Sequence, residues 1–391
     1  MLRILGLWST HQLTGGFITL SKPYRIIRSS APGRIVLFGE HQDYFNLPVI
    51  SAGVNLRMTV IGHFHDKPYI HLVLNNMKRT YTIPLQFPIP YRFRRAYLQS
   101  AINVFYRKGF NFEGFTASFS GNIPQNAGLS SSSALTVSWT AFLSRLLGKK
   151  LKPEEIAELA FETEVLEFNE PGGRQDVYAT ALGNVNFLEF PSTGLPLMTP
   201  LDVSKLDDIA FVVGNSQVKK RTLNTVYRIK QKVLSNMQNL KIKTLEGLET
   251  SDISNHANNK MLKAILNIKD ITIQGKELFS DTTVDGPALG KFLTKQHTIL
   301  RDDLHISIDR IESMIDGAMS NGAYGCKING SGEGGCILAI CSPDKVEDVM
   351  AGISKGKGKP YHVKLDTGVK VNVFGSKEAL RESNQSVNYI E

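Results

Sequence analysis

The 391-residue sequence is poor in cysteine and has no long apolar run. Its three cysteines, Cys326, Cys336 and Cys341, all lie late in the chain. This odd, sparse set excludes a disulfide scaffold and favours a reducing compartment such as the cytoplasm. No apolar stretch reaches the roughly 18 residues that a transmembrane helix needs, so we expect no membrane partner.

Acidic residues are absent from the first 39 positions and fewer than basic residues overall, 36 against 45. The basic residues are scattered and do not interleave with aromatic residues as they do on nucleic-acid-binding surfaces. We therefore expect no nucleic-acid partner, although the excess of basic residues over acidic residues suits a small anionic substrate. Gly15, Gly16 and Pro23 would interrupt an amphipathic transit helix. Residues 1–24 are predicted to form a leading extension.

A chain of this length is expected to form two domains. The run 191–200 is rich in Pro, Gly and Ser, and it predicts a boundary between domains 25–195 and 196–391. Strands and helices come in blocks, which indicates an α+β fold. The first domain is predicted to contain strands at 24–30, 34–38, 56–63, 69–73, 115–120 and 184–190, and helices at 97–108, 132–147, 153–168 and 177–182.

The second domain is predicted to begin with a strand at 209–213 and to be mostly helical from 217 to 320. Short strands at 326–329 and 336–340 flank a glycine loop, and a helix follows at 344–354. A closing hairpin is predicted over 361–374, with Asp366-Thr367-Gly368 as its turn.

No Walker A sequence occurs, which disfavours a P-loop enzyme. Residues 124–134, PQNAGLSSSSA, nevertheless join a predicted strand to a predicted helix. Small residues allow backbone N–H groups to crowd together, and the helix N-terminus adds a positive dipole, so the segment suits a phosphate group. The same serines are equally consistent with a helix N-cap. The residues alone leave both interpretations open.

A second glycine loop, Gly330-Ser331-Gly332-Glu333-Gly334-Gly335, matches the dinucleotide fingerprint in form. That fingerprint requires a helix after the glycines. The apolar run 336–340 predicts a strand instead, so we reject dinucleotide binding and expect a glycine-rich turn.

Three polar parts of the sequence are candidates for binding or catalysis. The cluster from Glu40 to Tyr44 follows a predicted strand and could bind the hydroxyls of a polyol or form an ordinary polar turn. Asp176 precedes a predicted helix and is a candidate general base or N-cap. Glu164 is a candidate metal ligand or a solvated residue.

Three segments, in this order, resemble the motifs of the GHMP small-molecule kinases, named for galacto-, homoserine, mevalonate and phosphomevalonate kinases. They are Gly33-Arg34 with Gly39-Glu40-His41, Pro124 with 128–132, and Lys327 with 330–336. The resemblance extends over about residues 29–341. It implies a two-lobed fold, with a ribosomal S5 domain 2-like N-terminal lobe, a ferredoxin-like C-terminal lobe and the site between them.

The pattern is most similar to galactokinases. Glu40, His41, Asp43 and Tyr44 match Glu-His-x-Asp-Tyr, and Arg34 stands where mevalonate kinases usually have Lys. Further matches are Gly173 with Asp176, and Asn215-Ser216-Gln217-Val218 followed by Tyr227. The sequence departs from the galactokinase pattern at Gln42, Phe45-Asn46-Leu47, Asn126 and Val177.

This resemblance implies an ATP- and Mg²⁺-dependent kinase acting on the anomeric hydroxyl of galactose or a related sugar. Asp176 and Arg34 would be catalytic, and Ser132 and Glu164 would hold Mg²⁺. Sugar hydroxyls would be bound by Glu40, His41, Asp43, Gly173 and Tyr227. The ATP phosphates would lie along Pro124, Gly128, Leu129, Ser130, Ser131, Ser132, Ser133, Ala134, Gly330 and Gly332.

Other functions stay open at this stage. The acceptor could be arabinose, galacturonate, N-acetylgalactosamine, a heptose phosphate or mevalonate. A non-catalytic sensor of sugar and ATP is an alternative from a different class, although the presence of Arg34, Ser132, Glu164 and Asp176 favours an enzyme. The sequence does not indicate the oligomeric state.

Overall fold

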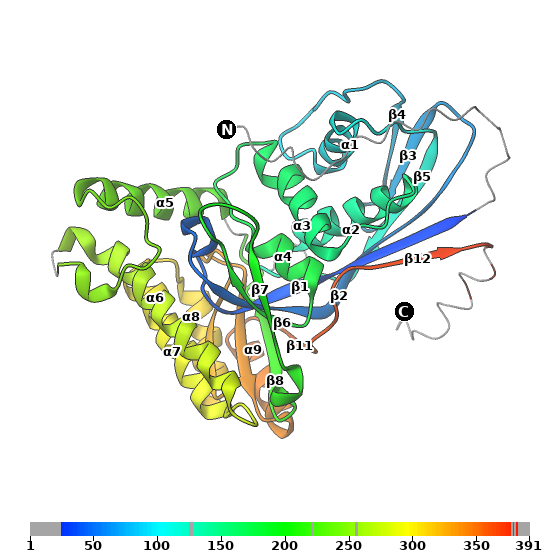
Figure 1. Ribbon diagram of the computed structural model, residues 1–391. Helices are drawn as coiled ribbons and strands as arrows, with labels where there is room; N and C mark the ends of the chain where they lie inside the picture. The colour runs from blue at the N-terminus through cyan, green and yellow to red at the C-terminus, as the bar shows by residue number, and fades with distance from the viewer. Residues whose placement is uncertain are drawn as a thin grey trace.

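The computed structural model describes residues 25–124, 128–219, 222–254 and 257–376, together with residues 378 and 381. The predicted extension 1–24 and Asn126 lie outside the described residues. Two β-sheets, each covered by helices, form two lobes that meet along β1 and β2 (Figure 1). The α+β fold with two lobes is confirmed.

The first sheet has the strand order β12-β1-β2-β5-β3-β4, and β6 pairs with β2 while β7 pairs with β6. Helices α2 and α4 pack on β1 and β2, and α1 and α3 pack against α2. The strands are β1 (Ile26–Phe38), β2 (Val49–Phe64), β3 (Tyr69–Leu74), β4 (Arg79–Pro84), β5 (Phe115–Gly121), β6 (Val185–Glu189), β7 (Leu197–Leu201) and β12 (Lys370–Phe374). The helices are α1 (Tyr97–Arg107), α2 (Ser131–Leu146), α3 (Pro153–Phe161) and α4 (Gln175–Leu182).

The second sheet is antiparallel with the order β11-β8-β10-β9. When the four strands are numbered by their order in the chain, their order in the sheet is 4-1-3-2. Helices α8 and α9 provide the two crossovers between strands. This is the ferredoxin-like arrangement that the resemblance implied. The strands are β8 (Ala210–Asn215), β9 (Gly325–Asn329), β10 (Cys336–Cys341) and β11 (Lys359–Val363). The helices are α5 (Thr222–Asn239), α6 (Lys260–Glu277), α7 (Gly286–Asp302), α8 (Asp309–Ser320) and α9 (Val346–Lys355).

Strand β1 is continuous where two strands were predicted. The pairing of β1 with β2 continues through Pro32 and Gly33, with a shift of register between these two residues. Proline is tolerated within a sheet at such a bulge, because no ladder hydrogen bond is required there. The bulge lies one residue before Arg34, and Arg34 N donates to Leu129 O over 3.1 Å.

The closing hairpin was predicted wrongly. β11 pairs with β8 in the second sheet, whereas β12 crosses back and pairs with β1 in the first (Figure 1). Arg57 fixes this crossover, donating to Asp366 Oδ2 over 2.8 Å and to the carbonyl oxygens of Thr367 and Gly368. The local sequence does not distinguish a link between two sheets from a hairpin turn.

The chain changes sheet later than the predicted boundary. Strand β7 was not predicted, and it pairs with β6 in the first sheet. The position between residues 195 and 196 therefore falls in the β6–β7 connection, and the second sheet begins only at β8. Strand β4 was also missed.

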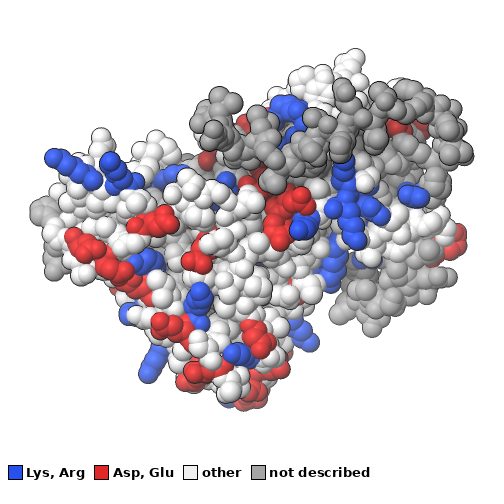
Figure 2. Space-filling view, viewed as in Figure 1, with Lys and Arg blue, Asp and Glu red and all other residues white. Residues whose placement is uncertain are grey.

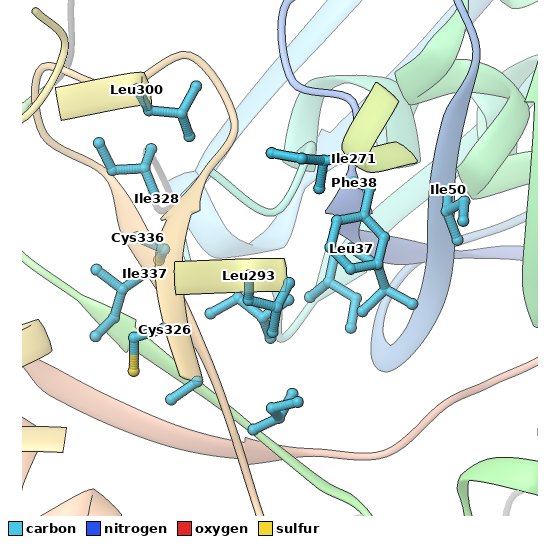
Figure 3. Packing of buried hydrophobic residues seen from close by; sticks show 14 of the residues in the cluster. Leu37, Phe38, Ile50, Ile271, Leu293, Leu300, Cys326, Ile328, Cys336 and Ile337 are labelled. Carbon is cyan, nitrogen blue, oxygen red and sulfur yellow. The ribbon is translucent and has the colours of Figure 1, made fainter. Parts of the chain in front are cut away.

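One apolar cluster joins the lobes. Leu37, Phe38 and Ile50 from β1 and β2 lie in the same cluster as Ile271 of α6 and Leu293 of α7 (Figure 3). A side chain at Gly275 would meet the Phe38 ring at 2.6 Å, so glycine allows α6 to approach β1. Burial of apolar surface contributes roughly 25 cal/mol per Å², which favours a fixed contact between the lobes.

None of the helices among the described residues is long and apolar enough to cross a membrane. Lys and Arg are interspersed with Asp and Glu on the face shown in Figure 2, in keeping with the scattered charges of the sequence.

Candidate active site

A pocket of about 280 Å³ lies where the lobes meet. Its walls include the serine-rich loop, the end of β1, the segment before α4, the start of α5 and the glycine loop between β9 and β10. Segments from both lobes therefore surround the pocket, as the resemblance implied.

Arg34 and Asp176 meet in this pocket. Arg34 Nε donates to Asp176 Oδ1 over 2.8 Å, and Arg34 also donates to Gly128 O. Ser130 Oγ donates to Asp176 Oδ2 over 2.6 Å. The Arg34 side chain is buried, whereas that of Asp176 is 41% exposed and faces the pocket. Arg174 occupies the N-cap position of α4, so the alternative that Asp176 is an N-cap is wrong.

The start of α2 favours the phosphate interpretation of the serine loop. Ser130 stands at the N-cap position with φ of 53°, and its side chain makes no capping hydrogen bond. Its hydroxyl bonds Asp176 instead. Ser131, Ser132 and Ser133 line the pocket at the helix N-terminus, where unpaired N–H groups and the dipole favour an anion.

Glu164 lines the pocket from a stretch of chain that departs from α-helical geometry. A continuous helix was predicted over 153–168, but α3 ends at Phe161 and a π-helical turn, Glu162–Leu166, follows. Such turns are often found at functional sites. Glu164 accepts from Thr136 Oγ1 over 3.0 Å, and Ser132 also bonds its carboxylate. Burial raises the pKa of Glu164.

Ser132 and Glu164 thus lie together as predicted for a cation site. Their oxygen donors suit Mg²⁺, which usually uses one or two protein ligands together with substrate phosphates. A cation would also offset the cost of burying the Glu164 charge. Among the described residues, no cluster of three or more His, Cys, Asp and Glu offers another metal site.

The glycine loop after β9 is tied to the first lobe. Asn329 Oδ1 accepts from Val36 N over 2.8 Å, and Asn329 Nδ2 donates to Gly128 O over 2.9 Å. Gly330 lines the pocket as predicted. Gly332 does not line the pocket, and a Cβ atom at this position would meet Ile306 at 2.7 Å.

His41, Asp43 and Gly173, which the resemblance assigns to the acceptor, line one wall of the pocket together with Tyr44. His41 Nδ1 is 2.7 Å from the Tyr44 hydroxyl, and Asp43 Oδ2 accepts from Gln175 N over 2.9 Å. A Cβ atom at Gly173 would lie 2.2 Å from Asp43 Oδ2, so only glycine allows this approach. Burial, together with the charge of Asp176, raises the pKa of Asp43 to about 6.

Glu40 borders the same wall, but both oxygens of its carboxylate already have protein partners. Lys327 Nζ bonds one oxygen and Gln296 Nε2 the other. Glu40 is 2% exposed, and Lys327 is fully buried with further bonds to the Val36 and Ile328 carbonyl oxygens, each 2.9 Å long. The structure therefore places Glu40 in a polar contact between the lobes.

Several predicted site residues lie outside the pocket. Tyr227 was expected to bind sugar, but it is 58% exposed and does not line the pocket. On α5 the pocket-lining positions are Thr222, Leu223 and Val226. Pro124, Leu129 and Ala134 belong to the serine loop but do not line the pocket either.

Sequence reasoning missed other pocket residues. Arg95 lines the pocket and pairs with Glu170 through Nε, 2.5 Å from Oε1. Val165, Gln175, Leu223 and Val226 also face the pocket. Gln175 lies within the Gly173–Asp176 segment, whereas the other positions belong to no recognisable motif and are brought together only by the tertiary fold.

Three family models match this chain. They describe the GHMP kinases N-terminal domain over residues 96–184, the GHMP kinases C-terminal domain over 284–358 and the galactokinase galactose-binding signature over 21–63. Together they cover more than half of the 391 residues.

Similar proteins include two kinds of kinase. A mevalonate kinase of Thermococcus onnurineus is 28% identical over 360 residues, covering 88% of this chain and 98% of the relative. A galactokinase of Pyrococcus furiosus is 25% identical, covering 88% and 99%.

Solved structures show the same fold. The Lactococcus lactis galactokinase complexed with galactose has a TM-score of 0.79 at 20% identity, covering 88% of this chain and 95% of that one. The Methanococcus jannaschii mevalonate kinase has a TM-score of 0.68 at 19% identity, covering 89% and 100%. The family models, both domains and the arrangement of the three motifs agree, and this chain belongs to the GHMP kinase family.

Proposed function

We propose that this protein is an ATP- and Mg²⁺-dependent sugar kinase that phosphorylates the anomeric hydroxyl of galactose or a sugar sharing its axial 4-hydroxyl. The observation that carries this proposal is the Arg34–Asp176 pair, which lies between a wall of serines and a wall of hydroxyl-binding residues. The match of residues 21–63 to the galactose-binding signature supports galactose as the acceptor.

The residues present fit ATP and Mg²⁺. Ser131, Ser132 and Ser133, with the N-terminus of α2, would hold phosphate oxygens, and Ser132 with Glu164 would hold Mg²⁺. When bound, ATP supplies the γ-phosphoryl group, and Mg²⁺ neutralises charge on the phosphates.

Asp176 is the proposed proton acceptor. Its carboxylate is exposed to the pocket, and the adjacent Arg34 guanidinium favours its ionised form. Asp176 would take the proton of the attacking hydroxyl, and Ser130 would keep the second carboxylate oxygen in place. Arg34 would also balance negative charge during transfer. General base help contributes about 10²–10⁴ in rate, and positioning contributes much of the remainder.

The acceptor would be oriented by Asp43, His41 and Tyr44, with Gly173 leaving room for the Asp43 carboxylate. An ionised Asp43 accepts from two neighbouring hydroxyls, which on galactose are O3 and the axial O4. A site that hydrogen-bonds a hydroxyl rejects isomers that misplace it, because buried polar groups are left unpaired.

Mevalonate is the second candidate acceptor. Mevalonate kinases are among the relatives at 25–28% identity, and Leu223 and Val226 give the pocket an apolar side that a branched acid could contact. A non-catalytic sensor is less well supported, since it has no need for the Arg34–Asp176 pair.

The test is an acceptor panel on the purified protein, with ADP release followed with galactose, glucose, mevalonate or no acceptor. We expect galactose to be used at least about 100-fold better than glucose in kcat/KM. Asp176→Asn protein purified in parallel controls for contaminating kinases. Turnover with mevalonate alone would overturn the sugar assignment but not the kinase activity. Absence of ADP release with every acceptor would overturn both.

A further inference from the structure

Glu333 stands in an unusual place for a charged side chain. It lies between Gly332 and Gly334 in the loop that borders the pocket, and it adopts φ of 55°. Its backbone N donates to Ile306 O over 2.7 Å. A residue other than glycine in this conformation costs about 1 kcal/mol or more, so a compensating contact is expected.

That contact is with helix α5. Glu333 Oε2 accepts from Thr225 Oγ1 over 2.8 Å, and Oε1 accepts from Arg228 Nη2 over 2.9 Å. Thr225 is 1% exposed, whereas the Arg228 and Glu333 side chains are partly exposed. Thr225 and Arg228 are three positions apart, so both lie on the same side of the helix and one carboxylate bonds both.

The neighbouring side of α5 forms the pocket wall. Thr222, Leu223 and Val226 line the pocket, and Lys230 follows one turn later. Lys230 Nζ lies 5.5 Å from the centre of the Tyr44 ring and donates to Pro171 O over 3.3 Å. Helix α5 therefore covers the side of the pocket that holds Asp43 and Tyr44.

We infer that Glu333 is a positioning residue for acceptor selection: its carboxylate fastens α5 to the glycine loop and so sets the distance of Leu223 and Val226 from the acceptor. The inference rests on the proposed function, because it assigns this end of the pocket to the acceptor. We call this attachment of α5 to the glycine loop the clamp. It includes a second, longer contact, in which Ser331 Oγ lies 3.3 Å from Thr222 Oγ1.

The test uses Glu333→Gly, because glycine adopts positive φ without strain and the loop keeps its conformation while the carboxylate is lost. We expect the KM for galactose to rise about tenfold and the KM for ATP to change less than threefold. Glu333→Gln should restore most of the galactose KM, since its amide can bond both Thr225 and Arg228. Asp348→Asn, at an exposed carboxylate on α9, is the matched control.

A double-mutant comparison identifies the partner. If the Thr225 contact carries the effect, Thr225→Val combined with Glu333→Gly should raise the galactose KM no further than Glu333→Gly alone. An unchanged galactose KM in Glu333→Gly, or an equal rise in both KM values, would overturn the inference.

The clamp is also measurable without turnover. Hydrogen exchange of the α5 amides should be faster in Glu333→Gly than in wild type or Asp348→Asn. If galactose is not a substrate, the proposed acceptor fails, and the KM comparison is made with the panel acceptor that is turned over. If no acceptor is turned over, unchanged exchange in α5 overturns the clamp and faster exchange supports it.

Discussion

Lys327 of β9 and Glu40 at the end of β1 form an ion pair that is closed to solvent on both sides and joins the two lobes. Glu40 also lines the pocket and is followed in sequence by His41 of the proposed acceptor wall. Removing one partner of a buried pair leaves an uncompensated charge, whereas removing both is far less damaging.

We predict that Lys327→Met lowers the free energy of unfolding by about 3–5 kcal/mol, because it leaves the buried Glu40 carboxylate without its cation. Urea denaturation followed by circular dichroism measures this change. The double variant Glu40→Gln with Lys327→Met should recover a substantial part of the loss. Lys345→Met, at a surface ion pair, should change stability by less than about 0.5 kcal/mol. A loss below 1 kcal/mol in Lys327→Met would show that the pair is not a structural link.

The catalytic assignment gives a second prediction. Asp176→Asn should lower kcat by about 10²–10⁴ with little change in ATP affinity, because it removes the proton acceptor but none of the proposed phosphate contacts. Steady-state kinetics and nucleotide titration of the folded variant measure both quantities. Asp281→Asn, at an exposed carboxylate, is the control. If kcat stays within about tenfold of wild type, Asp176 is not the base.

The magnesium site gives a third prediction. Ser132→Ala combined with Glu164→Gln should raise the Mg²⁺ concentration needed for half-maximal rate, because both oxygen ligands of the proposed site are weakened. Titration of the rate with MgCl₂ at fixed ATP measures it. Ser138→Ala, further along α2, controls for loss of a helix serine. An unchanged Mg²⁺ requirement would contradict the assignment.

The parts of the site that the sequence predicted are short segments with distinctive composition. The signal of the serine loop and that of the glycine loop each lie within about ten residues, and the elements that flank each loop were also predictable from local patterns. The Arg34–Asp176 contact was anticipated only through the family resemblance, since 142 positions separate the two residues.

The parts that were missed depend on long-range packing. Lys327 and Glu40 are 287 positions apart, and nothing in either segment shows that they meet. Tyr227 was misplaced because sequence similarity does not show which side chains of α5 reach the pocket. The crossover between β11 and β12 was misread because an Asp-Thr-Gly segment looks the same in a hairpin as in a link between sheets.

The fourth prediction concerns pH and the acceptor wall. Burial raises the pKa of Asp43 from 3.8 to about 6, and Lys230 opposes this rise. Hydroxyl binding by Asp43 needs the ionised carboxylate. We therefore expect kcat/KM for the acceptor to fall as the pH drops through about 6. Unfolding of the protein caused by protonation of Asp43 does not explain such a fall. A raised folded-state pKa makes its contribution to stability more favourable as the pH drops from about 6 to 4.

Variants at Asp43 and Lys230 test whether Asp43 is the group whose protonation causes this fall in kcat/KM, which we call the acid limb of the pH profile. Lys230→Met removes a positive charge that favours ionised Asp43, so the midpoint of the limb should move to higher pH. Lys232→Met, at an exposed position on the same helix, should leave the midpoint unchanged. Asp43→Asn keeps an oxygen that can accept from Gln175 N, so it should fold but bind acceptor poorly at every pH. An acid limb near pH 6 in the residual activity of Asp43→Asn would place the titrating group elsewhere, because this variant has no carboxyl at position 43.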